Sequence, residues 1–261
     1  MSERLNITEI KESVFHFFNV AFFPILLILF WQGLSATGVF TAVILPGPIQ
    51  VVKAFGEIVA NGSLAVDLGV SIVRVLRGYA FGALLGISLG IVAGLNKVVE
   101  HVVAPVINVI RQIPLYAWMP LLILWFGIGE VSKTIIIAQG VLIPTFLNTL
   151  QGIHSVPYEY KELSNVLGLT RALYIRKVIL PSAAISILTG LRLAAGNAWM
   201  AVVAAEMMGG LTGLGYALIN AKDFMYSDRL IALMIVSAFL GVLCDRLLRI
   251  VQKIALRWNK V

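Results

Sequence analysis

Six apolar stretches dominate this sequence, and each is close to the roughly 20 residues that an α-helix needs to cross a bilayer. They lie at about residues 15–35, 78–95, 102–126, 133–150, 182–205 and 230–250. Charged residues make up only 13% of the 261-residue chain, whereas an ordinary soluble domain has about 25%. The sequence therefore predicts an all-α polytopic membrane protein with six transmembrane helices.

The distribution of the 20 lysines and arginines predicts how these helices are oriented. If the N-terminus is cytoplasmic, twelve of them fall on inner segments and six, including Arg74 and Arg77, on outer segments. The other two, Arg111 and Arg192, lie within spans. This bias obeys the positive-inside rule and places both termini and residues 151–181 in the cytoplasm. We therefore attribute the net charge of +7 to membrane topology and not to nucleic-acid binding.

The first span is rich in Phe and Leu and has little that is polar, which predicts an anchoring helix at the lipid boundary. The sequence LPGP at 45–48 then predicts a turn and a helix that begins at Pro48. Val52, Phe55 and Val59 recur at helical spacing. We expect this outer helix to lie on the membrane surface.

The second span carries a glycine at every fourth position, namely Gly78, Gly82, Gly86, Gly90 and Gly94. Residues four apart share one face of a helix, so these glycines form a strip without side chains. Such a strip lets another helix approach closely. We interpret it as a helix-packing surface, with a glycine-lined pore wall as the alternative.

Two arginines lie within apolar spans, at about 14–16 Å from the cytoplasmic face if each residue adds 1.5 Å. A charge at that depth costs about 2.5–3.5 kcal/mol on insertion scales, so it should face protein or water. Arg111 and Arg192 are therefore either structural clasps or a positive ring on the path of an anion. Asn197 and Glu206 of the fifth span join this candidate pathway, and Glu206 is expected to pair with an arginine or to help seal an outer gate. The third span is interrupted by Pro114 and Pro120, as expected where a helix bends over protein or a cavity.

The segment Glu159–Pro181 carries six charges between two apolar spans. Tyr160, Leu163 and Leu167 recur at helical spacing, Pro157 suits a helix start and Gly168 suits its end. These residues predict a short amphipathic helix of about three turns in a cytoplasmic loop. Such a helix either lies on lipid headgroups or docks a partner.

The same segment resembles the EAA loop of ABC importer permeases, in which Glu-Ala-Ala, three residues, Gly, nine residues and Ile-x-Leu-Pro follow one another. Glu162, Gly168 and Leu180–Pro181 stand at the matching positions, and the departures are Leu163, Ser164 and Val178. Further stretches resemble the aliphatic-sulfonate, taurine and nitrate branch of these permeases: LPGP at 45–48, WFGIG at 125–129, GLR at 190–192, AE at 205–206, GLG at 213–215, NAKDF at 220–224 and LRWN at 256–259.

The resemblance implies a type I ABC importer permease, with residues 1–44 as an N-terminal anchor and residues 45–261 as a core that contains the coupling loop 151–181. It implies a homodimeric pore in the cell (inner) membrane that works with two ABC ATPase subunits and a periplasmic or lipid-anchored binding protein. The implied cargo is a small organic anion, closest to an aliphatic sulfonate, with nitrate or bicarbonate as alternatives. ATP and Mg²⁺ would bind to the partner ATPase, and this chain would bind no cofactor. The implied coupling residues are Glu159, Glu162, Leu163, Leu167, Gly168 and Pro181.

Motifs for catalysis are missing from the sequence. His16, His101 and His154 have no metal-ligand spacing, and no glycine run is followed by the Lys of a phosphate-binding loop. We therefore expect a protein that is not itself an enzyme. A self-contained secondary transporter is the alternative from another class, but its internal repeats are not apparent here.

Overall fold

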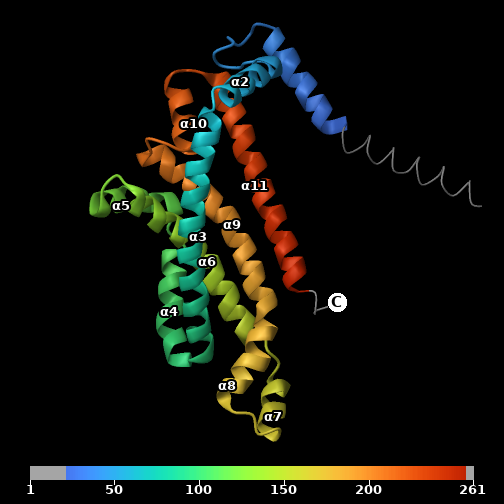
Figure 1. The fold of residues 1–261 in the computed structure, drawn as a ribbon, viewed down its shortest axis with the longest axis vertical. Helices are drawn as coiled ribbons and strands as arrows, with labels where there is room; N and C mark the ends of the chain where they lie inside the picture. The colour runs from blue at the N-terminus through green and yellow to red at the C-terminus, as the bar shows by residue number, and fades with distance from the viewer. Residues whose placement is uncertain (1–21, 257–261) are drawn as a thin grey trace, which may run out of the picture.

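The computed structural model describes residues 22–256, and every regular element in this range is helical. In chain order the elements are an apolar helix Phe22–Ala36, α2 (Pro48–Ala60), α3 (Ser63–Leu95), α4 (Lys97–Ile110), the 3₁₀ turn η1 (Leu115–Trp118), α5 (Met119–Phe126), α6 (Glu130–His154), α7 (Tyr158–Val166), α8 (Arg171–Tyr174), the π-helical turn η2 (Ile175–Ile179), α9 (Leu180–Gly209), α10 (Leu214–Asp223) and α11 (Ser227–Ala255). Helices α3, α6 and α9 pack on one another along the long axis of the molecule, with α7 and α8 at one end and α2 and α10 at the other (Figure 1).

Four helical stretches are long and apolar enough to cross a membrane: α3, α6, Arg171–Gly209 and α11. They correspond to the second, fourth, fifth and sixth predicted spans. The helix that contains the second predicted span begins earlier than residue 78, because α3 starts at Ser63. Arg74 and Arg77, which were expected in an outer segment, therefore lie within this helix.

The third predicted span, 102–126, is interrupted at Pro114, as the sequence indicated. After α4 ends at Ile110, the next helical stretch, Leu115–Phe126, is turned by 93°. Pro114 explains the break, because proline has no N–H to donate and disfavours helical geometry in the residue before it. If this bent pair counts as one span, the described residues hold up to five spans.

Two predicted features lie at the ends of the chain. The first predicted span lies partly outside the described residues, which contain the shorter apolar helix Phe22–Ala36. The stretch LRWN at 256–259 lies outside them except for its first residue.

Helix α2 begins at Pro48, as the sequence predicted. Its residues Val51 and Ile58 are buried in a cluster with residues of α10 and α11. Val52, Phe55 and Val59 are exposed on its other side. This arrangement is compatible with a helix that lies at the surface of the membrane.

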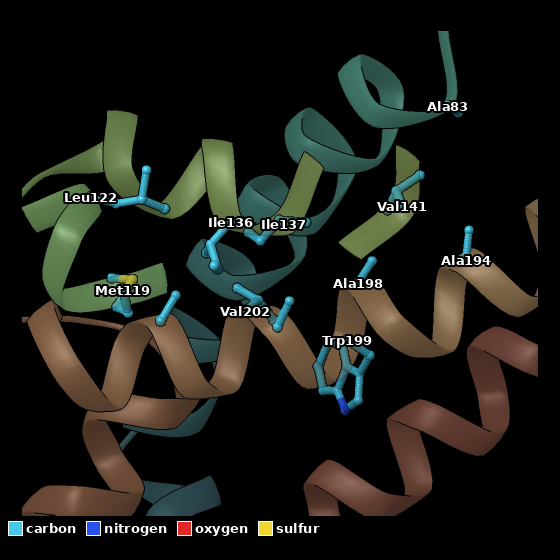
Figure 2. Packing of buried hydrophobic residues seen from close by; sticks show 12 residues of the cluster. Ala83, Met119, Leu122, Ile136, Ile137, Val141, Ala194, Ala198, Trp199 and Val202 are labelled. Atoms are coloured by element: carbon cyan, nitrogen blue, oxygen red, sulfur yellow. The ribbon is translucent and has the colours of Figure 1, made fainter. Parts of the chain in front are cut away.

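The core lies where α6 meets α3 and α9. Small side chains of α9, such as Ala198 and Val202, pack against Ile136 and Ile137 of α6, and Met119 of α5 completes the cluster (Figure 2). The α9 residues Ala194, Ala198, Ala201 and Ala205 are three or four positions apart and all buried, so they line one face of the helix. Close packing of this kind is how apolar helices associate where water supplies no driving force.

The glycine strip of α3 lies directly against α6. A Cβ atom at Gly82 would lie 2.4 Å from the carbonyl oxygen of Ala138, and one at Gly86 would lie 2.8 Å from that of Leu142. A Cβ atom at Gly90 would lie 2.6 Å from Thr149, and one at Gly94 would lie 2.9 Å from Ile153. Because two of these obstacles are backbone atoms, a side chain there would force the helices apart.

We expect Gly86→Leu to lower the yield of folded protein and its thermal unfolding temperature in detergent. Overpacking a close contact costs about 1–3 kcal/mol. Gly69→Leu on the same helix is the matched control, because a Cβ atom at Gly69 has no neighbour within 4 Å. Equal unfolding temperatures for the two variants would mean that the strip does not hold α3 against α6.

Candidate functional site

The predicted loop helix is present as α7, at the end of the molecule opposite to α2 and α10 (Figure 1). Pro157 precedes its first residue. Gly168 adopts φ +63° just after its end. The amides of Gly168 and Leu169 donate to the carbonyls of Asn165 and Ser164, at 3.1 and 2.9 Å. This pair of hydrogen bonds is the Schellman motif, in which glycine accepts a left-handed conformation at little cost.

The apolar residues predicted to form a stripe on α7 are exposed. Tyr160, Leu163 and Leu167 are 47%, 55% and 64% exposed. They border a recess of about 280 Å³ between α7 and the residues that lead into α9. Glu159 and Glu162 are also exposed. The helix thus presents an apolar surface with acidic neighbours, and residues 22–256 leave this surface uncovered. Val166, which the sequence analysis did not single out, adds to this surface and is 84% exposed.

Pro181 is the second residue of α9 and is partly buried. The turn immediately before α9 is the π-helical Ile175–Ile179. A proline within a helical stretch removes one hydrogen bond, and a local π turn is one of the ways a helix adjusts to this loss. The chain from Arg171 to Gly209 therefore continues as one helical stretch from the loop into the membrane-spanning part.

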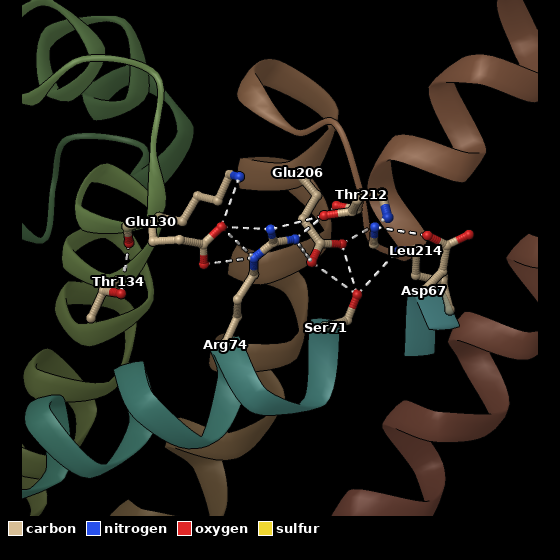
Figure 3. Close-up of polar contacts among 11 residues, drawn as sticks. Asp67, Ser71, Arg74, Glu130, Thr134, Glu206, Thr212 and Leu214 are labelled. Atoms are coloured by element: carbon tan, nitrogen blue, oxygen red, sulfur yellow. Dashed lines mark hydrogen bonds and ion pairs between the residues drawn. The ribbon is translucent and has the colours of Figure 1, made fainter. Parts of the chain in front are cut away.

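At the opposite end of the bundle a polar network with a buried centre joins three helices (Figure 3). Arg74 of α3 donates from Nη1 to Glu206 of α9 at 2.9 Å. It donates from Nη2 to Glu130 of α6 at 2.6 Å. Its Nη1 also donates to the carbonyl of Thr212 at 2.7 Å. Glu206 is fully buried and Arg74 is 5% exposed. Such charges are tolerated away from water only when they are paired and hydrogen-bonded.

The carboxylate of Glu206 also fixes the start of α10. Three consecutive backbone amides there donate to side chains of other helices: Gly213 N to Asp67 Oδ1, Leu214 N to Ser71 Oγ and Gly215 N to Glu206 Oε2, each at 2.9 Å. These amides belong to the start of a helix, where no carbonyl of the helix itself is available. Acidic side chains are also favoured there by the helix dipole.

The glycines of this turn leave room for the carboxylate. Gly213 has φ +107°, and a Cβ atom there would lie 2.4 Å from the carboxyl group of Glu206. A Cβ atom at Gly215 would lie 2.1 Å from the carbonyl oxygen of Val203. The stretches AE at 205–206 and GLG at 213–215 are therefore two halves of one structural unit.

Glu206 was expected to pair with an arginine or to help seal an outer gate, and the structure shows the pairing. Its partner Arg74 was not predicted, because residue 74 was expected in an outer segment. One signal in the sequence points to it. Asp67, Ser71 and Arg74 are spaced by four and three residues, so they form a polar face on a helix that starts earlier than residue 78.

Arg192, a candidate pathway residue, has an acidic partner in the structure. Its Nε donates to Asp245 Oδ1 of α11 at 2.6 Å, and its Nη2 donates to Oδ2 at 3.1 Å. Arg249 also donates to Asp245, at 3.1 Å. The pair ties α9 to α11, so Arg192 has an ion-pair partner within the chain, which it shares with Arg249. This geometry is that of a clasp, and a role in an anion path stays a prediction.

The other two pathway residues are in different settings. Arg111 follows the last residue of α4, beside the 93° bend, and is exposed. Asn197 of α9 donates to the carbonyl of Gly140 on α6 at 3.4 Å. The structure does not bring Arg111, Arg192 and Glu206 into one contact network. Within residues 22–256 no group of three or more His, Cys, Asp or Glu residues could hold a metal ion.

A family model described as "Binding-protein-dependent transport system inner membrane component" matches residues 82–256. An aliphatic sulfonates transport permease protein, SsuC of Bacillus subtilis (strain 168), is 39% identical over 236 residues, which cover 90% of this chain and 86% of the relative. SsuC of Escherichia coli (strain K12) is 36% identical and covers 91% of this chain and 90% of the relative. The bicarbonate transport system permease protein CmpB of Synechococcus elongatus is 31% identical, with coverage of 88% and 86%.

A solved structure of an amino acid ABC transporter has a similar fold. Its TM-score is 0.61 at 18% sequence identity, and the match covers 78% of this chain and 95% of that chain. At this identity the likeness shows the fold alone.

Proposed function

This chain belongs to the family of binding-protein-dependent transport system inner membrane components, the permeases of ABC importers, and on that premise we propose that it forms a homodimeric, ATP-driven pore for an aliphatic sulfonate. It is a multi-pass protein of the inner membrane, and its family consists of permease subunits that are not themselves enzymes. We assign the binding of ATP and Mg²⁺ to two partner ATPase subunits. A binding protein is assigned the task of delivering the cargo to the pore. Both termini are assigned to the cytoplasm.

The observation that carries this proposal is the exposed apolar surface of α7. Leu163, Val166 and Leu167 are more than half exposed on a helix that stands at one end of the molecule. A soluble partner that buries these side chains would gain about 25 cal/mol for each Å² of apolar surface removed from water. The Schellman turn at Gly168 and the continuous stretch Arg171–Gly209 connect this surface to the core. A push on α7 would therefore reach α9 through a helical connection.

The bend between α4 and η1 supports a second copy of the chain. Residues 111–114 at the bend are exposed, and they include the polar side chains of Arg111 and Gln112. Irregular backbone at membrane depth is tolerated only where protein covers it or water fills a cavity beside it. A homodimer with a central aqueous path supplies both the covering protein and the water-filled cavity. In such a dimer, Arg111 lies at the path or at the dimer contact.

The choice of a sulfonate rests on the relatives, since proteins named for aliphatic sulfonates have the higher identities quoted above. Arg192 adds less support for an anion than its position in the sequence suggested, because it is ion-paired with Asp245. Bicarbonate is the second candidate, because the 31% identical relative carries that name. Nitrate stays an alternative from the resemblance alone.

Uptake by cells with and without the gene for this chain tests the cargo. We expect loss of the chain to abolish uptake of radiolabelled ethanesulfonate and to leave uptake of labelled bicarbonate unchanged. Restoration of ethanesulfonate uptake by a plasmid copy is the control. Loss of bicarbonate uptake with normal ethanesulfonate uptake would reject the sulfonate and favour the second candidate.

A further inference from the structure

Arg77 is a charged residue of α3 that takes no part in the network around Arg74. It is exposed and, within residues 22–256, has neither a hydrogen-bond nor an ion-pair partner. Helix α3 has 33 residues, so Arg77 lies roughly 21 Å from its first residue and roughly 27 Å from its last, at 1.5 Å per residue. An unpaired arginine this far inside a membrane-spanning helix should face water or protein, because lipid would not stabilise its charge.

Glu130, the carboxylate that borders the same recess as Arg77, is already paired with other cations. It accepts hydrogen bonds from Arg74 and, at 3.3 Å, from Lys133. Lys133 is itself 4% exposed, so its ammonium group is held at this position. Glu130 is therefore not available to neutralise Arg77.

The charges in ion-pair contact balance one another. Arg74 and Lys133 contribute two positive charges, and Glu130 and Glu206 contribute two negative charges. Asp67 lies ten residues before Arg77 on α3, which is roughly 15 Å along the helix axis, and it accepts a hydrogen bond from the amide of Gly213. Among the described residues at this end of the bundle, Arg77 is thus a cation without an ion-pair partner.

Space for a ligand lies beside this charge. A recess of about 330 Å³ is lined by Gly69, Val70, Val73, Arg74, Arg77 and Glu130. Gly69 and Val73 precede Arg77 by eight and four residues, so the three lie on one face of α3. The absent side chain at Gly69 leaves this face open, since a Cβ atom there would meet no atom within 4 Å.

From this juxtaposition we propose that Arg77 is an anion-contact residue of the transport path, which meets the oxygens of a small oxyanion in the recess on α3. The proposal rests on the proposed import of an anion and adds a site to it. A guanidinium suits this task, because its planar fork donates two parallel hydrogen bonds to neighbouring oxygens. The hydrogen bonds from Arg74 hold the carboxylate of Glu130 in place, and this keeps Glu130 from pairing with Arg77. A lipid headgroup phosphate offers the same oxygens, so the test must separate a dissolved anion from lipid.

Cysteine labelling tests whether the site meets dissolved anions. The protein is the complete complex with its ATPase and binding protein in nanodiscs, carrying Arg77→Cys with Cys244→Ala. The probe is 2-sulfonatoethyl methanethiosulfonate, whose disulfide-forming sulfur is attacked by the thiolate introduced at position 77 while methanesulfinate leaves. We expect labelling in nanodiscs of neutral lipid, and slower labelling in excess ethanesulfonate. Failure of the water-borne reagent to label position 77 would place the site against lipid or in a dimer contact, and would overturn the proposal.

Transport provides the second readout. We expect Arg77→Gln to reduce ethanesulfonate uptake about tenfold, as the loss of a charge-assisted hydrogen bond would do, and Arg77→Lys to retain part of it. Lys53→Gln is the matched control, because Lys53 is an exposed cation on α2 outside the recess. Uptake by Arg77→Gln within twofold of the native rate would overturn the proposal. If the native complex carries no ethanesulfonate but position 77 is labelled in the cysteine variant, the sulfonate assignment fails and the site at Arg77 stands, with bicarbonate as the next probe.

Discussion

Replacing Arg74 with methionine is expected to cost about 3–5 kcal/mol of folding free energy, because it leaves the buried carboxylate of Glu206 without its cationic partner. Arg74 donates to Glu130, to Glu206 and to Thr212, so a single change removes hydrogen bonds from α3 to α6, to α9 and to the turn before α10. Thermal unfolding of the purified protein in detergent, followed by circular dichroism, would measure the loss.

A second substitution separates charge from packing. In Arg74→Met with Glu206→Gln, the amide at position 206 is neutral and still able to accept from Ser71 Oγ. We therefore expect the double variant to be more stable than Arg74→Met alone, which is a coupling that a double-mutant cycle measures directly. Glu57→Gln is the control, because Glu57 and Arg229 form an exposed ion pair whose loss should change little. Additive losses in the cycle would contradict the network described above.

Leu163→Asp is expected to abolish stimulation of ATP hydrolysis by the binding protein and to weaken assembly with the ATPase, while the permease itself folds normally. Leu163 is 55% exposed, so folding of the chain does not require its burial. A docked partner would have to bury the new charge within an apolar surface, which is costly. Co-purification of the two subunits and the rate of phosphate release are the measurements.

Two further variants make this prediction specific. Val98→Asp places the same charge on α4, at a side chain that is 74% exposed and outside the loop, and we expect normal coupling. Gly168→Val should lower coupling for a different reason. The backbone there has φ +63°, which a β-branched residue adopts only with strain, although space around the Cβ position is free. Normal stimulation in both Leu163→Asp and Gly168→Val would show that α7 is not the coupling element.

The features predicted correctly from the sequence are those encoded by neighbouring residues. The start of α2 at Pro48 and the ends of α7 at Pro157 and Gly168 each depend on a few adjacent residues with special backbone preferences. The apolar stripe of α7 was visible for the same reason, because it depends only on helical spacing.

The features that were missed depend on distant residues or on direction in space. Pro114 indicates a break in the third span, but a proline does not specify that the chain turns by 93°. Arg74 and Glu206 are separated by 132 residues, and only the packing of α3 against α9 brings them together. The pairing of Arg192 with Asp245 was missed for the same reason. Asp245 of α11 faces Arg192 of α9 only when the two helices have packed together. An arginine in an apolar span is therefore not by itself evidence for a pore, because an acid on another helix can pair with it.

The central claim, that this chain is a pore driven by a partner ATPase, is tested most directly by uptake into proteoliposomes. The vesicles would contain the permease and ATPase with ATP enclosed, and the binding protein and labelled ethanesulfonate would be added outside. We predict uptake that requires ATP, the ATPase and the binding protein together, and that stops with Leu163→Asp. Accumulation of ethanesulfonate by the permease alone, driven by a proton or sodium gradient, would contradict the account and identify a secondary transporter.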